Sequence, residues 1–149
     1  MSKASQKAAT YDDVNLILKL YDMRREPRLR EARAWFSSNF KATTFDEMMK
    51  LCPPGSNDNA SMRMVITHWE MVASFITSGV LNADLFYQSG RELLFVWERV
   101  RDILPEWRSQ YSDPNWLGNF EKVANEFIAC WKKQSPMAYD AFSKRVRGR

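Results

Sequence analysis

The sequence predicts an all-α protein, a single-domain helical bundle of about five to seven helices. Three observations support this fold class. The chain has only 5 glycines and 6 prolines in 149 residues, so few tight turns are expected. No five-residue window alternates Val, Ile and Thr with polar residues, as a half-buried strand would. Apolar residues recur instead at spacings of three and four, which is typical of helices that bury one face.

Two helices are expected in the N-terminal third, after a flexible tail at residues 1–9. Thr10 is a favourable N-cap residue for the first of them. An apolar stripe predicts that this helix is well buried, and the stripe consists of Val14, Ile17, Leu18 and Tyr21. Pro27 disfavours helical backbone at the residue before it. The first helix should therefore end near Arg25, and a second should begin at Pro27.

A short helix and a loop are expected next. Thr44 and Glu47 have the spacing of a capping box, which predicts a helix over residues 45–51. Residues 53–58, Pro-Pro-Gly-Ser-Asn-Asp, must form a loop. This loop divides an N-terminal helical hairpin from a C-terminal bundle within one domain of residues 1–149, because each half alone is too small for a stable core.

Three longer helices between Ser61 and Trp131 are expected to form the core. The first should begin after about Asn59. Its apolar residues follow spacings of three and four, typical of a bundle helix, and are Met62, Val65, Trp69, Val72 and Ile76. Gly79 suits the left-handed position that follows many helices, so the first core helix should end just before it.

The remaining helices follow from capping residues and prolines. Asn82 should cap the second core helix. Within that helix Gly90 predicts a kink or a close helix–helix contact, and Pro105 predicts a bend or a restart near Ile103. An Asp-Pro pair at residues 113–114 predicts the start of the third, because aspartate is a good N-cap and proline suits the first helical position. A Ser-Pro pair repeats this signal before a last short helix at residues 137–146.

Charge and cysteine content limit the class of protein. The net charge of +4 is a mild basic excess. No apolar stretch reaches the roughly 18 to 20 residues that cross a bilayer, and residues 1–10 lack the apolar segment of a secretory signal. Cys52 and Cys130 lie far apart without a CxxC pair, so neither a disulfide framework nor a zinc site is predicted. We expect a cytoplasmic protein without a cofactor, with Cys130 in the core and Cys52 more exposed.

Each core helix carries an aromatic residue followed by a glutamate, in the pairs Trp69-Glu70, Trp97-Glu98 and Phe120-Glu121. Two carboxylates in one apolar pocket could act as acid and base, so an enzyme using Glu70 and Glu98 is one alternative. A two-metal bundle site needs Glu-x-x-His pairs, and neither Glu98 nor Glu121 has a histidine three residues later. We favour ion pairing at the flank of the bundle, for which the available arginines are Arg63, Arg91, Arg99 and Arg101.

The order of motifs between Trp69 and Phe127 includes the first and last of these pairs, a Gly-Val-Leu-Asn turn at residues 79–82 and an aromatic helix containing Trp97. This order resembles a bacterial family of small helical domains of unknown function. The resemblance covers a little under half of the chain and implies a helical fold. Because that family has no established activity, the resemblance implies no catalytic residue. Many of its members carry N-terminal membrane helices, and this sequence shows none.

No motif in the chain specifies a reaction. His68 is the only histidine, and on a helix it points about 200° away from Glu70, so the two do not meet. A position at the surface or at its boundary is expected for this histidine. The sequence has no glycine-rich nucleotide loop and no GxSxG serine motif. We assign no catalytic, cofactor-binding or metal-binding residue.

Basic residues cluster in two segments, which makes a nucleic-acid-associated protein the main alternative function. The candidate phosphate contacts are Arg24, Arg25, Arg28, Arg30, Arg33, Lys144, Arg145, Arg147 and Arg149. Glu26 and Glu31 interrupt the first segment and partly cancel its field, whereas the C-terminal segment is not balanced in this way. With 18 acidic residues against 22 basic ones, we favour a solvated helix face over a nucleic-acid surface.

The leading hypothesis is a non-catalytic protein that acts through contact with a protein partner or with another copy of itself. The chain has more aromatic residues than one small bundle needs inside, and several lie near predicted helix ends and arginines. This composition is typical of the residues that anchor protein interfaces. The candidate interface residues, which this hypothesis requires to be exposed, are Trp35, Trp107, Trp116 and Tyr139. The alternative is that all these aromatic residues pack inside the bundle. No membrane contact is expected.

Overall fold

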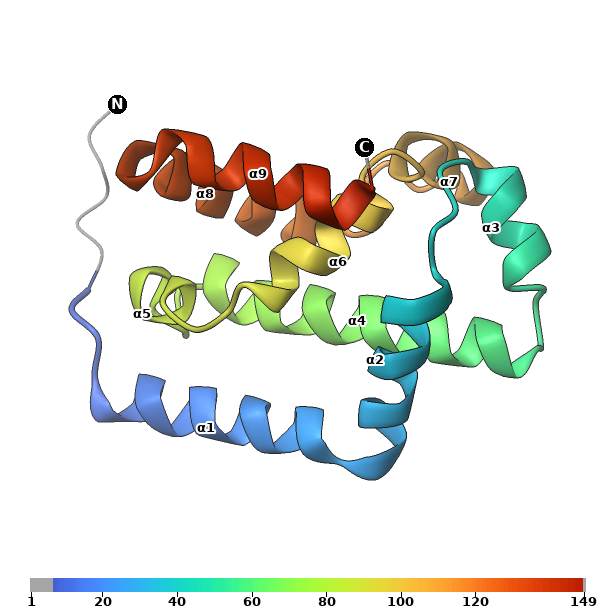
Figure 1. The fold of residues 1–149 in the computed structure, drawn as a ribbon. Helices are drawn as coiled ribbons and strands as arrows, with labels where there is room; N and C mark the ends of the chain where they lie inside the picture. Colours follow the sequence, from blue (N-terminus) through green and yellow to red (C-terminus); the bar gives the residue numbers. More distant parts are fainter. Residues whose placement is uncertain (1–6, 149) are drawn as a thin grey trace.

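A computed structural model describes residues 7–148, and within this range the chain folds into nine α-helices without a β-strand (Figure 1). The all-α class is therefore confirmed. The helices are α1 (Tyr11–Arg25), α2 (Pro27–Asn39), α3 (Phe45–Leu51), α4 (Asn57–Thr77), α5 (Ala83–Tyr87), α6 (Glu92–Val100), α7 (Leu104–Tyr111), α8 (Gly118–Gln134) and α9 (Pro136–Arg147). Most of the tail expected at residues 1–9 lies outside the described residues, and residues 7–9 are not helical.

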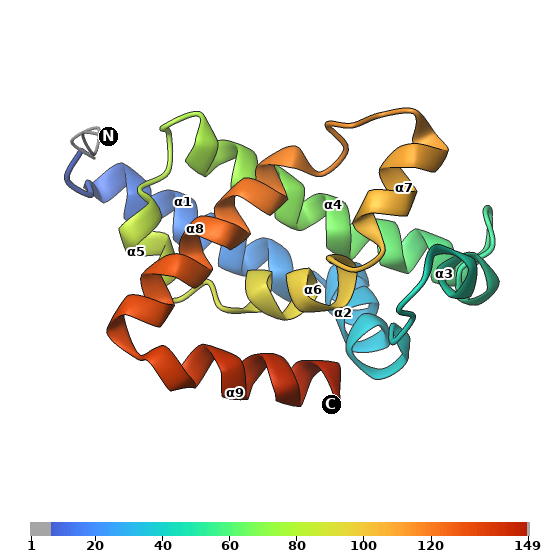
Figure 2. The ribbon, with the colours of Figure 1, turned by 90° about the horizontal axis from the view of Figure 1, so that it is seen from above.

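Helix α4 runs through the middle of the molecule, with α1 on one side of it and α8 with α9 on the other (Figure 1). Seen from above, α8 crosses α4 obliquely and α9 turns back beside α6 (Figure 2). The short helices α3 and α7 contact each other at one end of the molecule. The two helices that pack most extensively against α4 are α2 and α8.

The local signals for several helix ends are confirmed. Helix α3 spans residues 45–51, as predicted, and the Thr44 hydroxyl accepts a hydrogen bond from the Glu47 backbone N–H at 3.2 Å. The start of α4 is corrected by three residues, because Ser56 rather than Asn59 is the residue before its first turn. The Ser56 hydroxyl accepts a hydrogen bond from the backbone N–H of Asn59 at 3.1 Å. The predicted loop at residues 53–58 is therefore shortened to 53–56.

The predicted number of five to seven helices is too low, because the second core helix is divided into α5, α6 and α7. The first break lies at Gly90, where an added Cβ would come within 2.4 Å of the Phe86 ring. Position 90 therefore requires glycine, because the Phe86 ring lies too close to the backbone for a side chain. The second break precedes Pro105, which lies in the first turn of α7. The restart predicted near Ile103 is confirmed, because α7 begins at Leu104, whereas Gly90 marks a complete break rather than a kink.

The predicted start of α8 at residues 113–114 is wrong. Residues 113–117 form turns, and α8 begins at Gly118 after Leu117, whose backbone is left-handed with φ of 57°. Leu117 is buried, and it has no side chain that could accept a hydrogen bond from the first turn of α8. The N-terminal backbone groups of α8 must therefore find their acceptor elsewhere in the fold.

A connected cluster of buried apolar side chains, from Leu20 of α1 to Tyr139 of α9, has members on all nine helices of the described chain. Aromatic pairs fill much of it. Phe36 and Phe40 stack with ring centroids 4.6 Å apart, and Trp97 of α6 meets Phe120 of α8 at 5.5 Å. Among residues 7–148, no helix combines the length and apolar character needed to cross a membrane.

Candidate functional site

Exposed apolar side chains are concentrated on α1. Of the eight large apolar residues that are well exposed in the described part of the chain, five belong to this helix, namely Tyr11, Val14, Leu18, Tyr21 and Met23. Tyr11, Val14, Leu18 and Tyr21 are 78%, 40%, 56% and 52% exposed and follow the spacing of one helical stripe. We refer to these four residues as the outer face of α1. Contiguous exposed apolar surface of this kind marks interaction sites.

The N-terminal end of α1 is fixed by a buried carboxylate. Asp13 accepts a hydrogen bond from the backbone N–H of Thr10 at 2.8 Å and another from the backbone N–H of Asn82 at 2.8 Å. Because both bonds favour the ionised form, the first more than the second, they lower the pKa of Asp13. Asn82 also caps α5 by accepting a hydrogen bond from the backbone of Leu85. One carboxylate thus ties the start of α1 to the turn between α4 and α5.

The C-terminal end of α1 is fixed by an ion pair. Arg24 pairs with Glu92 at the start of α6, and Arg33 of α2 binds the same carboxylate with its Nε at 2.6 Å. The hydrogen bond to Glu92 raises the pKa of Arg33. The Arg24 guanidinium also lies over the Trp69 ring, 5.6 Å from its centroid. Helix α1 is therefore held firmly at both ends, although the apolar stripe between them faces outwards.

The expectation that α1 is well buried is wrong for most of its stripe. Only Asp13 and Leu20 are buried, and Leu16 and Ile17 are partly buried against the core. The side of α1 that packs against the core is thus narrower than the predicted apolar stripe and is turned away from it about the helix axis. Periodicity detects an apolar face but does not show whether another segment of the same chain covers it.

The predicted interface aromatics divide into two groups. Trp107 and Tyr139 are only 2% and 3% exposed, so the expectation that these two are exposed is wrong. Trp107 packs against Trp116 at 5.6 Å, and Tyr139 packs against Trp131 at 5.7 Å, because the turns after α7 and α8 fold these rings back onto the bundle. Trp35 and Trp116 are partly buried and pack against the core.

The basic residues do not form a single patch. Arg24 and Arg33 are paired with Glu92, and Arg28 donates hydrogen bonds to Ser61, whereas Arg25 and Arg30 are exposed. Among the arginines from Arg24 to Arg33 only Arg25 and Arg30 are exposed, and the nucleic-acid alternative stays a prediction. In the C-terminal segment, Lys144 and Arg145 are exposed, Arg147 is engaged in ion pairs, and Arg149 lies outside the described residues.

The three aromatic-Glu pairs have three different partners. Glu70 of α4 accepts hydrogen bonds from the backbone N–H of Phe120 at 2.7 Å and from the Asn119 side chain at 2.9 Å, both in the first turn of α8. Glu121 of α8 pairs with Arg108 of α7 at 3.1 Å. Glu121 thus forms an ion pair as favoured from sequence, but with Arg108, which was not among the four predicted arginines. Glu70 instead supplies the acceptor that the first turn of α8 lacks locally.

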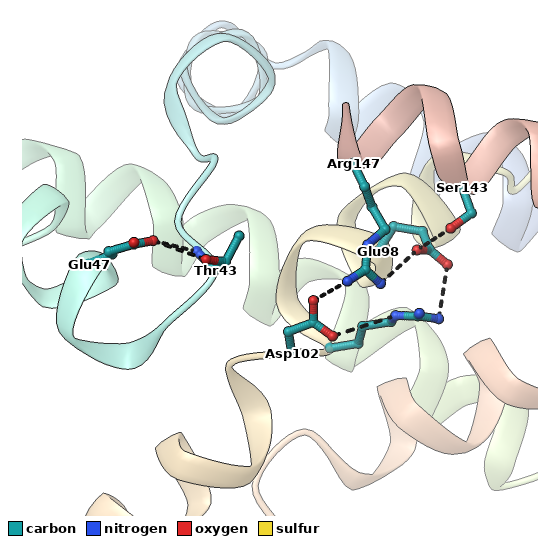
Figure 3. Close-up of polar contacts among 7 residues, drawn as sticks. Thr43, Glu47, Glu98, Asp102, Ser143 and Arg147 are labelled. Carbon is teal, nitrogen blue, oxygen red and sulfur yellow. Dashed lines mark hydrogen bonds and ion pairs between the residues drawn. The ribbon is translucent and has the colours of Figure 1, made fainter. Parts of the chain in front are cut away.

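Glu98 is the most enclosed of the three, with a fully buried side chain on α6 (Figure 3). Ser143 of α9 donates a hydrogen bond to its Oε2 at 2.8 Å. Arg101 lies 3.5 Å from Oε1, and Arg147 lies 3.7 Å from Oε2 and also pairs with Asp102. Figure 3 shows Ser143 and Arg147 approaching from α9, so this carboxylate ties the last helix to the middle of the bundle.

The enzyme alternative requires Glu70 and Glu98 to lie in one pocket. Glu98 borders a surface pocket with residues of α9, whereas Glu70 lies against the start of α8. Among residues 7–148, no group of three or more His, Cys, Asp or Glu side chains is placed to hold a metal ion. The structure therefore brings these carboxylates to separate structural contacts.

His68 and the cysteines differ from expectation in their burial. His68 is buried rather than superficial, and burial, reinforced by the charge of Arg24, lowers its pKa to about 4. Cys52 is fully buried, which raises the pKa of its thiol to about 11, whereas Cys130 is only partly buried. Segments that are distant in sequence pack around His68 and Cys52, so the residues next to them in sequence could not predict their burial.

A model of the family described as "Domain of unknown function (DUF4760)" matches residues 9–127. The chain belongs to this family. The resemblance to a family of unknown function is thereby confirmed, and the match extends from Trp69 back to residue 9. No curated protein and no solved structure matches the chain.

The segment shared with the DUF4760 family contains the outer face of α1 and both of its anchors, Asp13 and Arg24. It also contains Glu70 and Glu98. The residues that contact Glu70 lie within the matched segment, whereas Ser143, which donates a hydrogen bond to Glu98, lies after the end of that segment. The site on α1 is therefore built entirely from residues that match the family model.

The outer face of α1 is not among the site residues predicted from the sequence, although its spacing can be read there. Tyr11 precedes Val14 by three residues, and Leu18 and Tyr21 continue the spacing. This spacing indicates an apolar face but does not show whether the face packs inside the chain or remains exposed.

Proposed function

We propose that this protein acts through protein–protein contact and that the outer face of α1 is the contact surface. One observation carries the proposal: four apolar side chains at helical spacing are 40% to 78% exposed on a helix whose two ends are anchored. A rigid helix with an uncovered apolar stripe can dock without the entropic cost of ordering a flexible segment. Two of the four residues are tyrosines, a residue type enriched at interfaces.

The occupant we propose for this face is α1 of a second copy, packed antiparallel. The exposed Arg25 projects from the same side of α1 as the stripe, whereas the exposed Asp12 projects from nearly the opposite side. An antiparallel two-fold arrangement centred on Leu18 brings Tyr11 of each copy towards Arg25 of the other, and symmetry makes this cation–aromatic pairing twice. A parallel arrangement would instead place the two copies of Arg25 together.

The expected association is weak. Helix α1 has 15 residues, so its face is about 22 Å long. Such a face is smaller than the roughly 800 Å² that each partner contributes to a standard stable interface. We therefore expect a dissociation constant in about the micromolar range and a concentration-dependent mixture of monomer and dimer.

Sedimentation velocity from about 1 µM to about 500 µM tests the proposal. The sedimentation coefficient of the wild-type protein should rise with concentration, and Leu18→Glu should remove the rise by placing a charge at the centre of the contact. Met137→Glu is the matched control, because Met137 is an exposed apolar residue on α9, which lies on the other side of α4 from α1 (Figure 1). A wild-type protein that stays monomeric throughout, or an equal effect of both variants, would contradict the proposal.

The cytoplasmic location and the absence of catalysis stay predictions. The first is supported by two free cysteines, of which Cys52 is fully buried. The second is supported by the separate structural contacts of Glu70 and Glu98.

A further inference from the structure

A pocket of about 240 Å³ lies where three segments that are distant in sequence meet. They are the connection between α2 and α3 at residues 41–43, the C-terminal end of α6 with the turn after it, and the last turn of α9. Glu98 and Asp102 border the pocket on one side, and Arg147 reaches them from α9 (Figure 3). The pocket is independent of the outer face of α1.

Cationic side chains dominate the lining. Lys41, Arg99, Arg145 and Arg147 face two carboxylates. The two carboxylates are already engaged, because Arg147 pairs with both and Arg101 lies behind the pocket within 3.5 Å of Glu98. Three cations, Lys41, Arg99 and Arg145, consequently have no carboxylate partner among residues 7–148. This surplus of positive charge favours the binding of an anionic ligand.

Arg99 is held in place in a way that leaves donors available. Its Nη1 donates to the backbone carbonyls of Phe36, Ser37 and Phe40 at 3.2, 2.7 and 3.1 Å, at the C-terminal end of α2. Its guanidinium lies over the Phe95 ring at 4.6 Å. Burial without an anionic partner lowers the pKa of Arg99. Neither Nε nor Nη2 has a hydrogen-bond acceptor within the described part of the chain, so a planar fork remains for an oxyanion.

The size and charge of the pocket define the class of ligand. Its volume is below the roughly 300 Å³ at which pockets for drug-sized organic ligands begin. A compact, multiply charged oxyanion fits such a space, and arginine with lysine is the donor set that binds phosphate. We propose that this pocket binds a phosphate group, free in solution or carried by a small molecule, through Lys41, Arg99 and Arg145.

Titration of inorganic phosphate into the full-length protein, followed by amide chemical shifts at constant ionic strength, tests this proposal. We expect saturable shifts at residues 41–43 and 145–148, with half-saturation below about 10 mM. The double variant Lys41→Gln with Arg145→Gln should weaken binding at least about tenfold, because two of three contacts are removed. These two side chains make no ion pair or hydrogen bond within the described chain, so the fold should be unaffected.

The matched control is the double variant Lys122→Gln with Lys133→Gln, which removes the same charge from exposed positions on α8. Its phosphate affinity should equal that of the wild type. Three results would overturn the proposal: shifts that do not saturate, an equal loss of affinity in both double variants, or binding to phosphatidic acid vesicles without binding to inorganic phosphate. The last result would indicate a lipid surface rather than a site for a compact phosphate.

Discussion

The Glu70 carboxylate of α4 lies 2.7 Å from the backbone nitrogen of Phe120 in the first turn of α8. Its other oxygen accepts a hydrogen bond from the Asn119 side chain at 2.9 Å. Helix α8 has no local side-chain cap, since the residue before it is Leu117 in a left-handed conformation. A residue 50 positions earlier in sequence therefore provides both the hydrogen-bond acceptor and the negative charge that favour a helix N-terminus.

Replacing this carboxylate should destabilise the fold. Glu70→Gln keeps the length of the side chain but removes the charge and one of the two acceptor oxygens. We expect a loss of about 1–2 kcal/mol in the free energy of unfolding, measured by urea denaturation. Glu31→Gln, at an exposed position on α2, is the control and should change the free energy by less than about 0.5 kcal/mol. Similar losses in the two variants would refute a capping role for Glu70.

The contact between Glu98 and Ser143 should couple α9 to the rest of the bundle. Glu98→Gln weakens an acceptor that is fully buried, and Ser143→Ala removes its donor at 2.8 Å. In a double-mutant cycle we expect a coupling energy of about 1 kcal/mol, because a hydrogen bond to a charged group is stronger than a neutral one. In Glu98→Gln, the amide hydrogen-exchange rates of α9 should rise more than those of α4. Additive single-variant effects would show that the two residues act independently.

Gly90 should not tolerate a methyl group. An added Cβ would approach three atoms of the Phe86 ring at 2.4 to 2.8 Å, and a buried ring in a packed core cannot move away cheaply. We expect Gly90→Ala to lower the melting temperature and to cost about 1–3 kcal/mol. Gly118→Ala is the matched control, because nothing lies within 4 Å of its added Cβ and its φ is not positive. It should be neutral or slightly stabilising, and an equal cost at both positions would contradict the packing argument.

His68 should make stability depend on pH. Burial lowers its pKa to about 4 in the folded state, against 6.5 for an ordinary histidine. The unfolded chain therefore binds a proton between these values that the folded chain does not, so stability is lost as pH falls through 6.5 towards 4. Between about pH 7.5 and about pH 5, the loss from this group should be about 2 kcal/mol.

The measurement compares urea denaturation of the wild type and His68→Gln over that range. The variant should show a flatter profile, because its side chain does not titrate. The lowered pKa values of Asp13, Glu26 and Glu47 affect stability only at more acidic pH, since their ordinary values are 3.8 and 4.5. Because His68 is the only histidine, its proton resonance gives the folded-state pKa directly. A value near 6.5 would contradict the burial found here.

The helical class and several helix ends could be predicted because they depend on neighbouring residues. Thr44, Ser135-Pro136 and Gly79 act through local backbone geometry, and their signals correspond to the observed ends of α3, α9 and α4. The start of α8 could not be predicted, because its capping group is Glu70 on another helix. The break at Gly90 likewise depends on the position of the Phe86 ring, which only the folded chain defines.

Burial was the least predictable property of the site. Trp107 is enclosed because α7 and the following turn fold back on the core, and Tyr139 because α9 packs beside α8. The stripe on α1 has the same periodicity as those of the buried helices, yet its outer half is exposed. An amphipathic pattern indicates that a helix has an apolar face, and only the tertiary arrangement shows whether the chain covers that face itself.

Disulfide trapping tests the antiparallel contact through α1 most directly. In the proposed arrangement the two copies of Leu18 face each other at the two-fold axis, close enough for a disulfide between Cα atoms about 4.4–6.8 Å apart. We predict that Leu18→Cys, in a Cys130→Ser background with the buried Cys52 retained, forms covalent dimers under mild oxidation, and that Met137→Cys in the same background does not. A Leu18→Cys protein that remains monomeric, or that forms no more dimer than Met137→Cys, would contradict the central claim.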